Sequence, residues 1–190
     1  MLVAVEGIVE TLRGVPPPRF QPGHICKLLH NLSIRPETLQ PFLHFAPGRY
    51  TRNLIYRDEL FELLALCWDP RTRSPIHNHA NQLCWLAVHQ GALRLENFHS
   101  LDGPGPGEGI RLVPRGGIDQ APIGCVDLQQ GEDAIHRVSN PFDERAVSLH
   151  VYSRPYDVCL AYDPEAQTAC EMRLTYHSVG GRVVGAEQRQ

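Results

Sequence analysis

Three histidines have the side-chain type and the spacing that suit a metal site. His77 and His79 are two residues apart, and in an extended strand such side chains point to the same face. A third imidazole, from His136 on a facing strand, would complete a pocket of three nitrogens. Imidazole suits Fe, Zn, Cu or Ni, and three protein ligands leave coordination positions open for chemistry. Because the chain has ten histidines, the alternative is two surface residues on a polar strand face.

Three polar side chains alternate along another stretch. Ser148, His150 and Tyr152 would all face one way on a strand. If that face is buried, an uncharged His150 needs a partner at each ring nitrogen, and its two neighbours are placed to serve. Tyr152 would then present its hydroxyl to a substrate or to oxygen. Two alternatives stay open: a satisfied polar cluster without chemistry, and His150 as the third metal ligand in place of His136.

Two apolar stripes precede these residues and indicate helices. Their spacing is that of one helix face, and the residues are Val5, Ile8, Val9 and Leu12, then Ile25, Leu28, Leu29 and Leu32. Three prolines from Pro16 separate the stripes, and Pro36 with Glu37 indicates the start of a third short helix. We expect these helices to pack on one side of a β structure.

From Thr51 onward, short apolar or alternating segments broken by Gly and Pro predict antiparallel strands. A Gly- and Pro-rich stretch over 99–109 is expected to be a mobile hairpin connection between strands at 94–98 and 110–113. The sequence has no internal repeat and no second-domain boundary. We therefore predict one domain over 1–190, with a mostly helical segment 1–48, a β body 49–178 and a frayed tail 179–190.

Composition favours a soluble enzyme with one domain. A chain of 190 residues can bury a proper core. Its net charge is −3 with acids and bases interspersed, which argues against nucleic-acid and anionic-membrane partners. No apolar run approaches the length of a transmembrane helix, and residues 1–6 lack the pattern of a secretion signal. Six scattered cysteines without a Cys-x-x-Cys pair favour a reducing cytoplasm over a disulfide scaffold or zinc ribbon.

Two short motifs surround the histidines. In chain order they comprise His77, His79, the apolar run 83–88 and Gly91, then Pro122-Ile123-Gly124, Gly131, His136 and Asn140. The pattern resembles the two motifs of the cupin superfamily, which supply metal ligands from facing strands of a small β-barrel. The resemblance implies a mostly β, jelly-roll-like barrel with short N-terminal helices. The first motif usually carries a glutamate ligand, and Cys84 stands at that position, which leaves a neutral three-histidine site.

Four segments narrow the resemblance to the cysteine dioxygenase family, the thiol dioxygenase branch of the cupins. Their order and spacing run through most of the chain, and they are 49–54, 76–84, 136–138 and 146–153. In that family three histidines bind non-haem iron(II), so the resemblance gives this role to His77, His79 and His136. It makes Arg52, with Tyr50 in the same segment, the substrate-binding part of the site. It also makes Ser148, His150 and Tyr152 a hydrogen-bonding relay behind the metal.

Cys84 has a further meaning in this resemblance. In the animal enzymes of the family, the matching cysteine forms a thioether bond to the tyrosine that matches Tyr152, and this chain keeps both partners. Cys84 is five residues past His79, so a turn near 80–82 must intervene before Cys84 faces the pocket. The alternative is that Cys84 is a small buried hydrophobe.

Arg52 and Arg154 give opposing signals about the substrate. Arg52 offers a permanently charged planar fork suited to a carboxylate, although a surface ion pair with Asp58 or Glu59 is the alternative. Animal-type members have serine followed directly by proline, whereas Arg154 intervenes here, as in relatives that oxidise 3-mercaptopropionate. Those relatives usually carry glutamine at the position of Arg52. The longer matching segment around Arg52 favours cysteine, with Arg154 a further candidate for substrate contact.

The sequence therefore predicts a cytoplasmic iron(II) thiol dioxygenase that converts L-cysteine to cysteine sulfinic acid, with the thiol and O₂ as its partners. One alternative keeps the chemistry and takes 3-mercaptopropionate as substrate. Another is a zinc site that activates water for hydrolysis or isomerisation. A ligand-binding cupin without activity is the last alternative, and Arg52 and Tyr152 beside all three ligands argue against it. No feature of the sequence assigns an oligomeric state.

Overall fold

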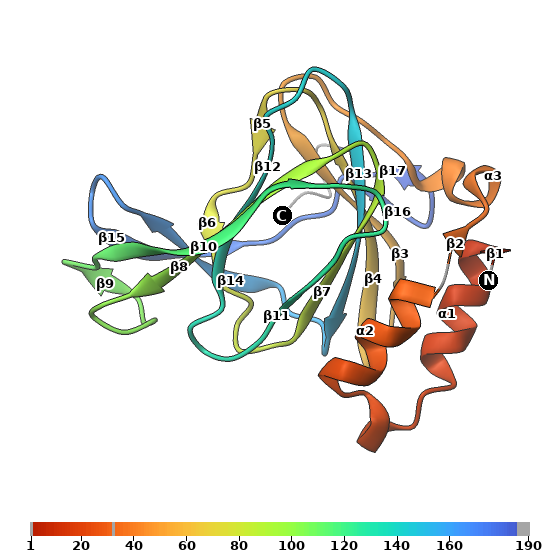
Figure 1. Ribbon diagram of the computed structural model, residues 1–190, viewed down its shortest axis with the longest axis horizontal. Helices are drawn as coiled ribbons and strands as arrows, with labels where there is room; N and C mark the ends of the chain where they lie inside the picture. The colour runs from red at the N-terminus through yellow and green to blue at the C-terminus, as the bar shows by residue number, and fades with distance from the viewer. Residues whose placement is uncertain (1, 32, 186–190) are drawn as a thin grey trace.

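Two packed β-sheets with helices on one outer face make up the computed structural model, which describes residues 2–31 and 33–185 (Figure 1). The predicted mostly β, jelly-roll-like fold is confirmed, but the sheets form a sandwich and do not close into a barrel. The helical elements are α1 (Val5–Arg13), η1 (Pro17–Arg19), α2 (Pro22–Asn31), α3 (Pro36–Leu39) and η2 (Gln40–Phe42). Among the described residues, none of the helices has the length and hydropathy needed to cross a bilayer.

The first sheet carries two of the three predicted metal ligands, His77 and His136. Its strands follow the order β10 (Leu112–Ala121), β8 (Leu93–Ser100), β12 (Ile135–Asn140), β6 (Ile76–His77), β14 (Val158–Asp163), β15 (Thr168–Arg173) and β9 (Gly107–Glu108). An eighth strand, β5 (Thr72–Arg73), also pairs with β12. The pairing of β8 with β10 confirms the predicted hairpin, and β9 lies within its connection. The mobility of that connection stays a prediction.

The second sheet carries the other predicted site residues. Its strands follow the order β11 (Val126–Gln129), β7 (Cys84–Gln90), β13 (Ala146–Ser153), β4 (Phe61–Trp68), β3 (Tyr50–Arg57), β16 (Ser178–Val179) and β17 (Arg182–Val183). A separate parallel pair joins β1 (Leu2–Val3) to β2 (Ser33–Ile34) beside the helices.

Strand β4 is buried along its whole length because its two faces contact different layers. One face packs against the helices through Phe61, Leu63, Ala65 and Cys67. The other packs between the sheets through Leu64, Leu66 and Trp68. Strand β13 alternates in the same way, with Val147, Leu149 and Val151 toward the helices. The period of two therefore leaves Ser148, His150 and Tyr152 facing the space between the sheets.

The N-terminal helices cover the outer face of the second sheet. The four apolar residues predicted for α1 are all buried in it, and α2 buries Ile25 and Leu29. Leu28 is partly buried against the same cluster, and Leu32 lies outside the described residues. The third helix begins at Pro36 as predicted. The prediction that these helices pack on one side of the β structure is confirmed.

The tail prediction is wrong over its first residues. Strand β16 pairs in parallel with β3, and β17 folds back on β16. The glycines that indicated fraying instead make the turn, because Gly180 and Gly181 have φ values of 55° and 79°, which glycine adopts without strain. Residues 186–190 lie outside the described part of the chain.

Candidate active site

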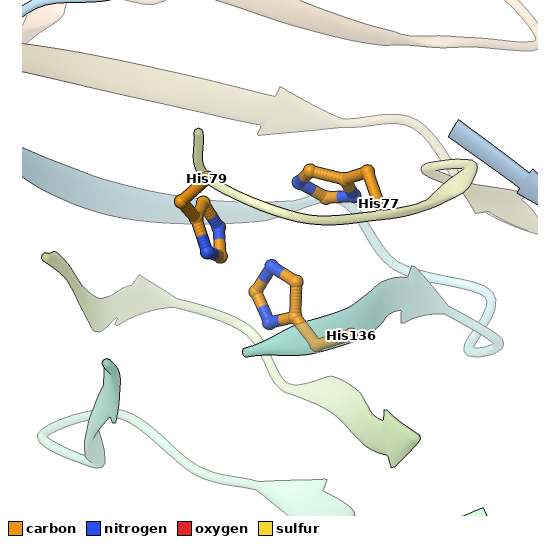
Figure 2. A group of neighbouring side chains, drawn as sticks. All are labelled: His77, His79 and His136. Carbon is orange, nitrogen blue, oxygen red and sulfur yellow. The ribbon is translucent and has the colours of Figure 1, made fainter. Parts of the chain in front are cut away.

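The three predicted metal ligands come together between the sheets. Strands β6 and β12 place His77 and His136 directly opposite each other as paired residues. With His79 they offer nitrogen atoms that all lie within 4.8 Å of one another. Figure 2 shows the three rings turned toward a common space. The alternative, that His77 and His79 are two surface histidines, is wrong, because His79 is only 1% exposed and His77 is half-buried.

His79 lies beyond the end of β6, not on the strand as predicted. The chain turns immediately after it, with Ala80 and Asn81 at φ values of 48° and 60°. The Gln82 N–H donates to the His79 carbonyl oxygen at 2.8 Å and closes this turn. The turn expected before Cys84 is confirmed, and the chain enters β7 at Cys84 directly after it.

Burial keeps these imidazoles uncharged. Desolvation lowers the pKa of His77 to about 4 and holds the pKa values of His79 and His136 well below the ordinary value. The neighbouring imidazoles and Arg52 add a smaller effect in the same direction. Neutral imidazole is the form that binds a metal ion, so the cluster is ready to act as a ligand set at neutral pH.

Unpartnered nitrogens support the same assignment. Both ring nitrogens of His79 and Nδ1 of His136 are buried without a hydrogen-bond partner. His77 differs, because its Nδ1 lies 3.0 Å from the Pro75 carbonyl oxygen, to which it can donate. Such a bond fixes the tautomer and leaves Nε2 free as a ligand. Buried polar atoms without partners are rare in proteins, and a metal ion bound by the three rings would take one nitrogen from each of them.

The alternating residues of β13 form a hydrogen-bonded row. Trp68 Nε1–H donates to Ser148 Oγ at 2.9 Å, so the serine can donate its own proton to His150 Nε2, also at 2.9 Å. The proton of the neutral ring then sits on Nδ1, which lies 3.1 Å from Tyr152 Oη. Both nitrogens of His150 are thus satisfied as predicted, and His150 is not part of the metal cluster. Burial lowers the pKa of His150 to about 3 and raises that of Tyr152, so both groups are neutral.

Cys84 lies directly opposite Tyr152 on neighbouring strands of the second sheet. Its side chain is fully buried, and its Sγ is 3.9 Å from His150 Nδ1. Burial raises the pKa of the Cys84 thiol, so the sulfur is protonated at neutral pH. Cys84 is therefore a small buried residue, as the alternative interpretation expected. It is also a direct neighbour of Tyr152, the predicted partner in the thioether.

Arg52 is buried on β3 and does not form the surface ion pair offered as its alternative. It contacts neither Asp58 nor Glu59 but pairs with Glu62, with 3.4 Å between the guanidinium and the carboxylate. The guanidinium is 8% exposed, and its Nε has no hydrogen-bond partner. A buried guanidinium with unused donors is suited to a further anionic group.

Glu62 is a site residue that the sequence interpretation missed. Its carboxylate accepts a hydrogen bond from the Tyr176 hydroxyl at 2.6 Å and lies 3.7 Å from Arg57. Tyr176 also places its ring 5.5 Å from the Arg52 guanidinium carbon. The available signal was a lone acid at the second position of the apolar run over 61–68, on the face opposite the helices.

A small cavity joins the parts of the site. Its lining comprises Tyr50, Arg52, Leu66, Trp68, Ser74, His77, His136, Val138, His150, Tyr152, Tyr156, Met172 and Leu174. The predicted Tyr50 therefore belongs to the site, where its ring stacks on Trp68 at a centroid distance of 4.9 Å. Tyr156 was missed, and its ring contacts that of Tyr152 edge to face.

Arg154, which the sequence predicted to contact the substrate, lies outside the active-site cavity. Its side chain is exposed and is absent from the lining of the cavity. Its backbone has a φ of 59°, and its N–H donates to the Leu60 carbonyl oxygen at 2.7 Å. The residue thus forms part of the turn after β13, and we do not include it among the substrate contacts.

The fold and the site together define a small β-sandwich protein with a buried three-histidine metal-binding centre. Comparison with known proteins is more specific. The family model described as cysteine dioxygenase type I matches residues 23–165. Cysteine dioxygenase type 1 of Danio rerio is 30% identical over 184 residues, which cover 93% of this chain and 88% of the relative. The human protein of the same name is 33% identical over 142 residues, covering 74% of this chain and 68% of the relative.

This chain belongs to the cysteine dioxygenase type I family of enzymes. Among solved structures it resembles an uncharacterised conserved protein with a double-stranded β-helix domain from Klebsiella pneumoniae. That likeness has a TM-score of 0.45 and 11% identity, over 72% of this chain and 95% of the other.

A first prediction concerns the metal ligands. In His136→Ala one of the three nitrogens is gone, and we expect loss of a tightly bound divalent metal ion on reconstitution, measured as metal per chain. His30→Ala, on the exposed part of α2, is the matched control and should keep its metal. Full metal retention in His136→Ala would place the third ligand elsewhere, and His150 would be the first residue to test.

A second prediction concerns the stability of the metal-free protein. Its buried histidines have pKa values below that of an unfolded histidine, about 6.5. The unfolded chain therefore binds more protons than the folded chain at mildly acidic pH, and the free energy of unfolding must fall as pH drops below about 6.5. We expect a slope on the order of 1.4 kcal/mol per pH unit for each histidine involved.

Urea unfolding of the metal-free protein between about pH 5 and pH 7.5 measures this slope, in a range above most carboxylate titration. His30→Gln, which removes an exposed histidine, should leave the slope unchanged. Stability that stays constant across this range would show that the clustered histidines are not held neutral by burial.

Proposed function

We propose that this chain is an iron(II)-dependent thiol dioxygenase of the cytoplasm, which adds both atoms of O₂ to the sulfur of L-cysteine to give cysteine sulfinic acid. One observation carries the proposal. The buried Arg52 guanidinium lines the same small cavity as two of the three clustered histidines and Tyr152. The cavity is thus lined both by histidines that would hold a metal ion for the substrate sulfur and by the arginine that would bind the substrate carboxylate. Relatives named cysteine dioxygenase type 1 support this substrate and reaction.

The ligand set suits a thiol substrate. Three neutral imidazoles cancel none of the charge of a divalent ion, so the centre attracts a thiolate and favours the deprotonated form of the substrate. Bound iron(II) would supply the redox chemistry that takes the thiol to the sulfinic acid. His77, His79 and His136 would hold the ion from one side and leave the other side to the substrate.

Arg52 is the group proposed to bind the substrate carboxylate. Its pairing with Glu62 orients the guanidinium and uses only part of its donor capacity, since an arginine carries five N–H donors. Tyr50 and Trp68 stack along the same wall and limit where a substrate can lie. The amine of cysteine would then lie between the carboxylate and the sulfur, close to the metal centre.

The Ser148, His150 and Tyr152 row is proposed to hold one proton in place. Each hydrogen bond in the row is donated from Trp68 toward Tyr152, so Tyr152 Oη accepts from His150. The hydroxyl proton of Tyr152 is therefore free to be donated outside the row. Tyr152 lines the cavity, and its raised pKa keeps the phenol protonated. Its role is therefore to donate a hydrogen bond to the reacting groups, with His150 as the positioning residue behind it.

The proposed function is tested by oxygen uptake with a panel of thiols. The iron-loaded chain should consume O₂ with L-cysteine and release the sulfinic acid, identified by mass spectrometry. A higher kcat/KM for 3-mercaptopropionate than for cysteine would keep the reaction type and change the substrate. No uptake with any thiol by an iron-loaded, folded chain would contradict the proposal.

A third prediction concerns Arg52. Arg52→Gln should lower kcat/KM for cysteine far more than for cysteamine, which has no carboxylate, because truncating one partner of a desolvated charge pair typically costs about 2–5 kcal/mol. The variant also removes one of the partners of Glu62, so the melting temperature of the variant is measured alongside. Cysteine and cysteamine kinetics that change by the same factor would show that Arg52 supports the fold and does not bind the carboxylate.

We also include a thioether between Cys84 and Tyr152 in the proposal. The two residues are paired across β7 and β13, so little movement is needed to bring the sulfur to the ring. Formation of the carbon–sulfur bond removes two hydrogen atoms, one from the thiol and one from the ring, and their two electrons and two protons pass to O₂, which becomes hydrogen peroxide. The step is an oxidation because the thiol and the ring together hold two more hydrogen atoms than the thioether, and burial, which raises the pKa of Cys84, keeps the thiol protonated before it.

A fourth prediction follows for the mass of the active enzyme. After turnover with iron and O₂, intact-mass measurement should show a fraction of chains lighter by two hydrogen atoms, and peptide mapping should join the segments that hold Cys84 and Tyr152. Cys84→Ser and Tyr152→Phe should each abolish that species. Cys159→Ser removes another buried cysteine and is the control that should retain it. The same lighter species in Cys84→Ser would assign the loss to a different pair.

A further inference from the structure

A groove lined by arginines opens beside the active-site cavity. We call it the arginine groove, and its lining is Gly48, Arg49, Tyr50, Thr51, Arg52, Arg71, Thr72, Arg73 and 172–177. The ends of three strands form it: the start of β3, the whole of β5 and the end of β15. It shares Tyr50, Arg52, Met172 and Leu174 with the cavity that holds the metal cluster.

The arginine groove carries one sign of charge. Five arginines line it, and none of its lining residues is acidic. Arg71 pairs with Asp143 and Arg52 pairs with Glu62. The other three arginines, Arg49, Arg73 and Arg173, are exposed and form no salt bridge within the described part of the chain. This local excess contrasts with the net charge of −3 for the whole chain.

The groove is also the hollow most closely joined to the cavity. A hollow near Asn78 and Cys159 shares no lining residue with the cavity, and the one near Val183 shares only Leu174. The side chains that line both groove and cavity are the half-buried Tyr50, Met172 and Leu174 and the buried Arg52. A ligand in the groove therefore meets the proposed carboxylate-binding residue next.

We propose that the arginine groove is the access route to the active site and that it concentrates anionic thiols, the thiol carboxylates with net negative charge. The proposal rests on the proposed function, since it adds a charge preference among the thiols that reach the same site. A cleft lined by one sign of charge raises the local concentration of the oppositely charged ligand and its rate of association. Arg49, Arg73 and Arg173 would raise the rate at which an anionic thiol enters the groove. Arg52 would instead bind the carboxylate of the thiol once it is in the active site.

Three thiols separate capture from chemistry. At neutral pH 3-mercaptopropionate has a net negative charge, cysteine has none and cysteamine has a net positive charge. For the unmodified enzyme, kcat/KM should fall with added salt for 3-mercaptopropionate, stay level for cysteine and rise for cysteamine. Salt to about 0.5 M should remove most of this difference, because it screens exposed charges beyond a few Å. An equal response of all three thiols to salt would overturn the proposal.

Reversing the charge of the three exposed groove arginines tests whether the salt-dependent preference arises in the groove. In the variant Arg49→Glu/Arg73→Glu/Arg173→Glu, kcat/KM for 3-mercaptopropionate at low salt should fall by about tenfold and that for cysteamine should rise. The kcat values should stay within about twofold, since the bound substrate contacts none of the three. The matched control is Arg19→Glu/Lys27→Glu/Arg115→Glu, which has the same change in net charge on exposed residues outside the groove. Equal effects in both variants would assign the preference to net charge alone.

A measurement without catalysis separates this proposal from the proposed function. Thr175→Cys places a thiol on the groove lining, and its alkylation by iodoacetate, an anion, is compared with that by neutral iodoacetamide. Exposed Cys170, outside the lining, is the internal reference, and peptide mass spectrometry resolves the sites. The rate with iodoacetate divided by the rate with iodoacetamide should be higher at position 175 of the Thr175→Cys variant than at Cys170. At position 175 this ratio should drop about fivefold when the three groove arginines are also changed to glutamate. If the three arginine-to-glutamate changes leave this ratio unchanged, the groove proposal is overturned. If the ratio drops but the enzyme oxidises no thiol, only the proposed function is contradicted.

Discussion

Burial of polar groups between two apolar sheet faces is the constraint on which the site depends. A buried polar atom without a hydrogen-bond partner costs about 1–3 kcal/mol, and the clustered histidines contain several such nitrogens. His150 is equally buried, yet Ser148 and Tyr152 satisfy both of its nitrogens. The same burial thus divides the histidines of the interior into two kinds. Those that keep at least one ring nitrogen without a partner are fit to bind a metal, and the one with partners at both nitrogens is fit to orient a neighbour.

The buried charge of Arg52 is managed by the same principle. A lone guanidinium in this environment would be strongly unfavourable, and Glu62 compensates it from the neighbouring strand. Glu62 in turn accepts the Tyr176 hydroxyl and lies near Arg57, which is itself paired with Asp157. The carboxylate is therefore held from several sides, while Arg52 keeps an unpartnered Nε. This arrangement gives a fixed cation with donors to spare, which is what recognition of a small carboxylate requires.

The parts of the site that the sequence predicted are those with local spacing or motif context. His77, His79 and His136 lie in two short motifs, and the alternation of Ser148, His150 and Tyr152 follows directly from strand geometry. Tyr176 could not be found in this way, because its hydrogen bond to Glu62 joins positions far apart in the chain. Glu62 had only the signal of a lone acid in an apolar run, and its pairing with Arg52 depends on how β3 and β4 align. Arg154 failed for the opposite reason: its sequence position is close to Tyr152, but a turn with positive φ carries it to the surface. The glycines near 180 show the same limit, since composition alone does not distinguish a frayed tail from a tight turn.

The site is shared between the two sheets, and this explains why so little of it is contiguous in sequence. The first sheet supplies His77 and His136 from paired strands, and the second supplies Arg52 and Tyr152. The distance between the metal centre and the carboxylate-binding arginine is therefore set by the packing of one sheet on the other, through Leu64, Leu66, Leu95 and Val138. Interiors packed at high density transmit small changes in volume. A substitution at such a core position would alter the fit of a substrate held at both ends without touching any residue that binds it.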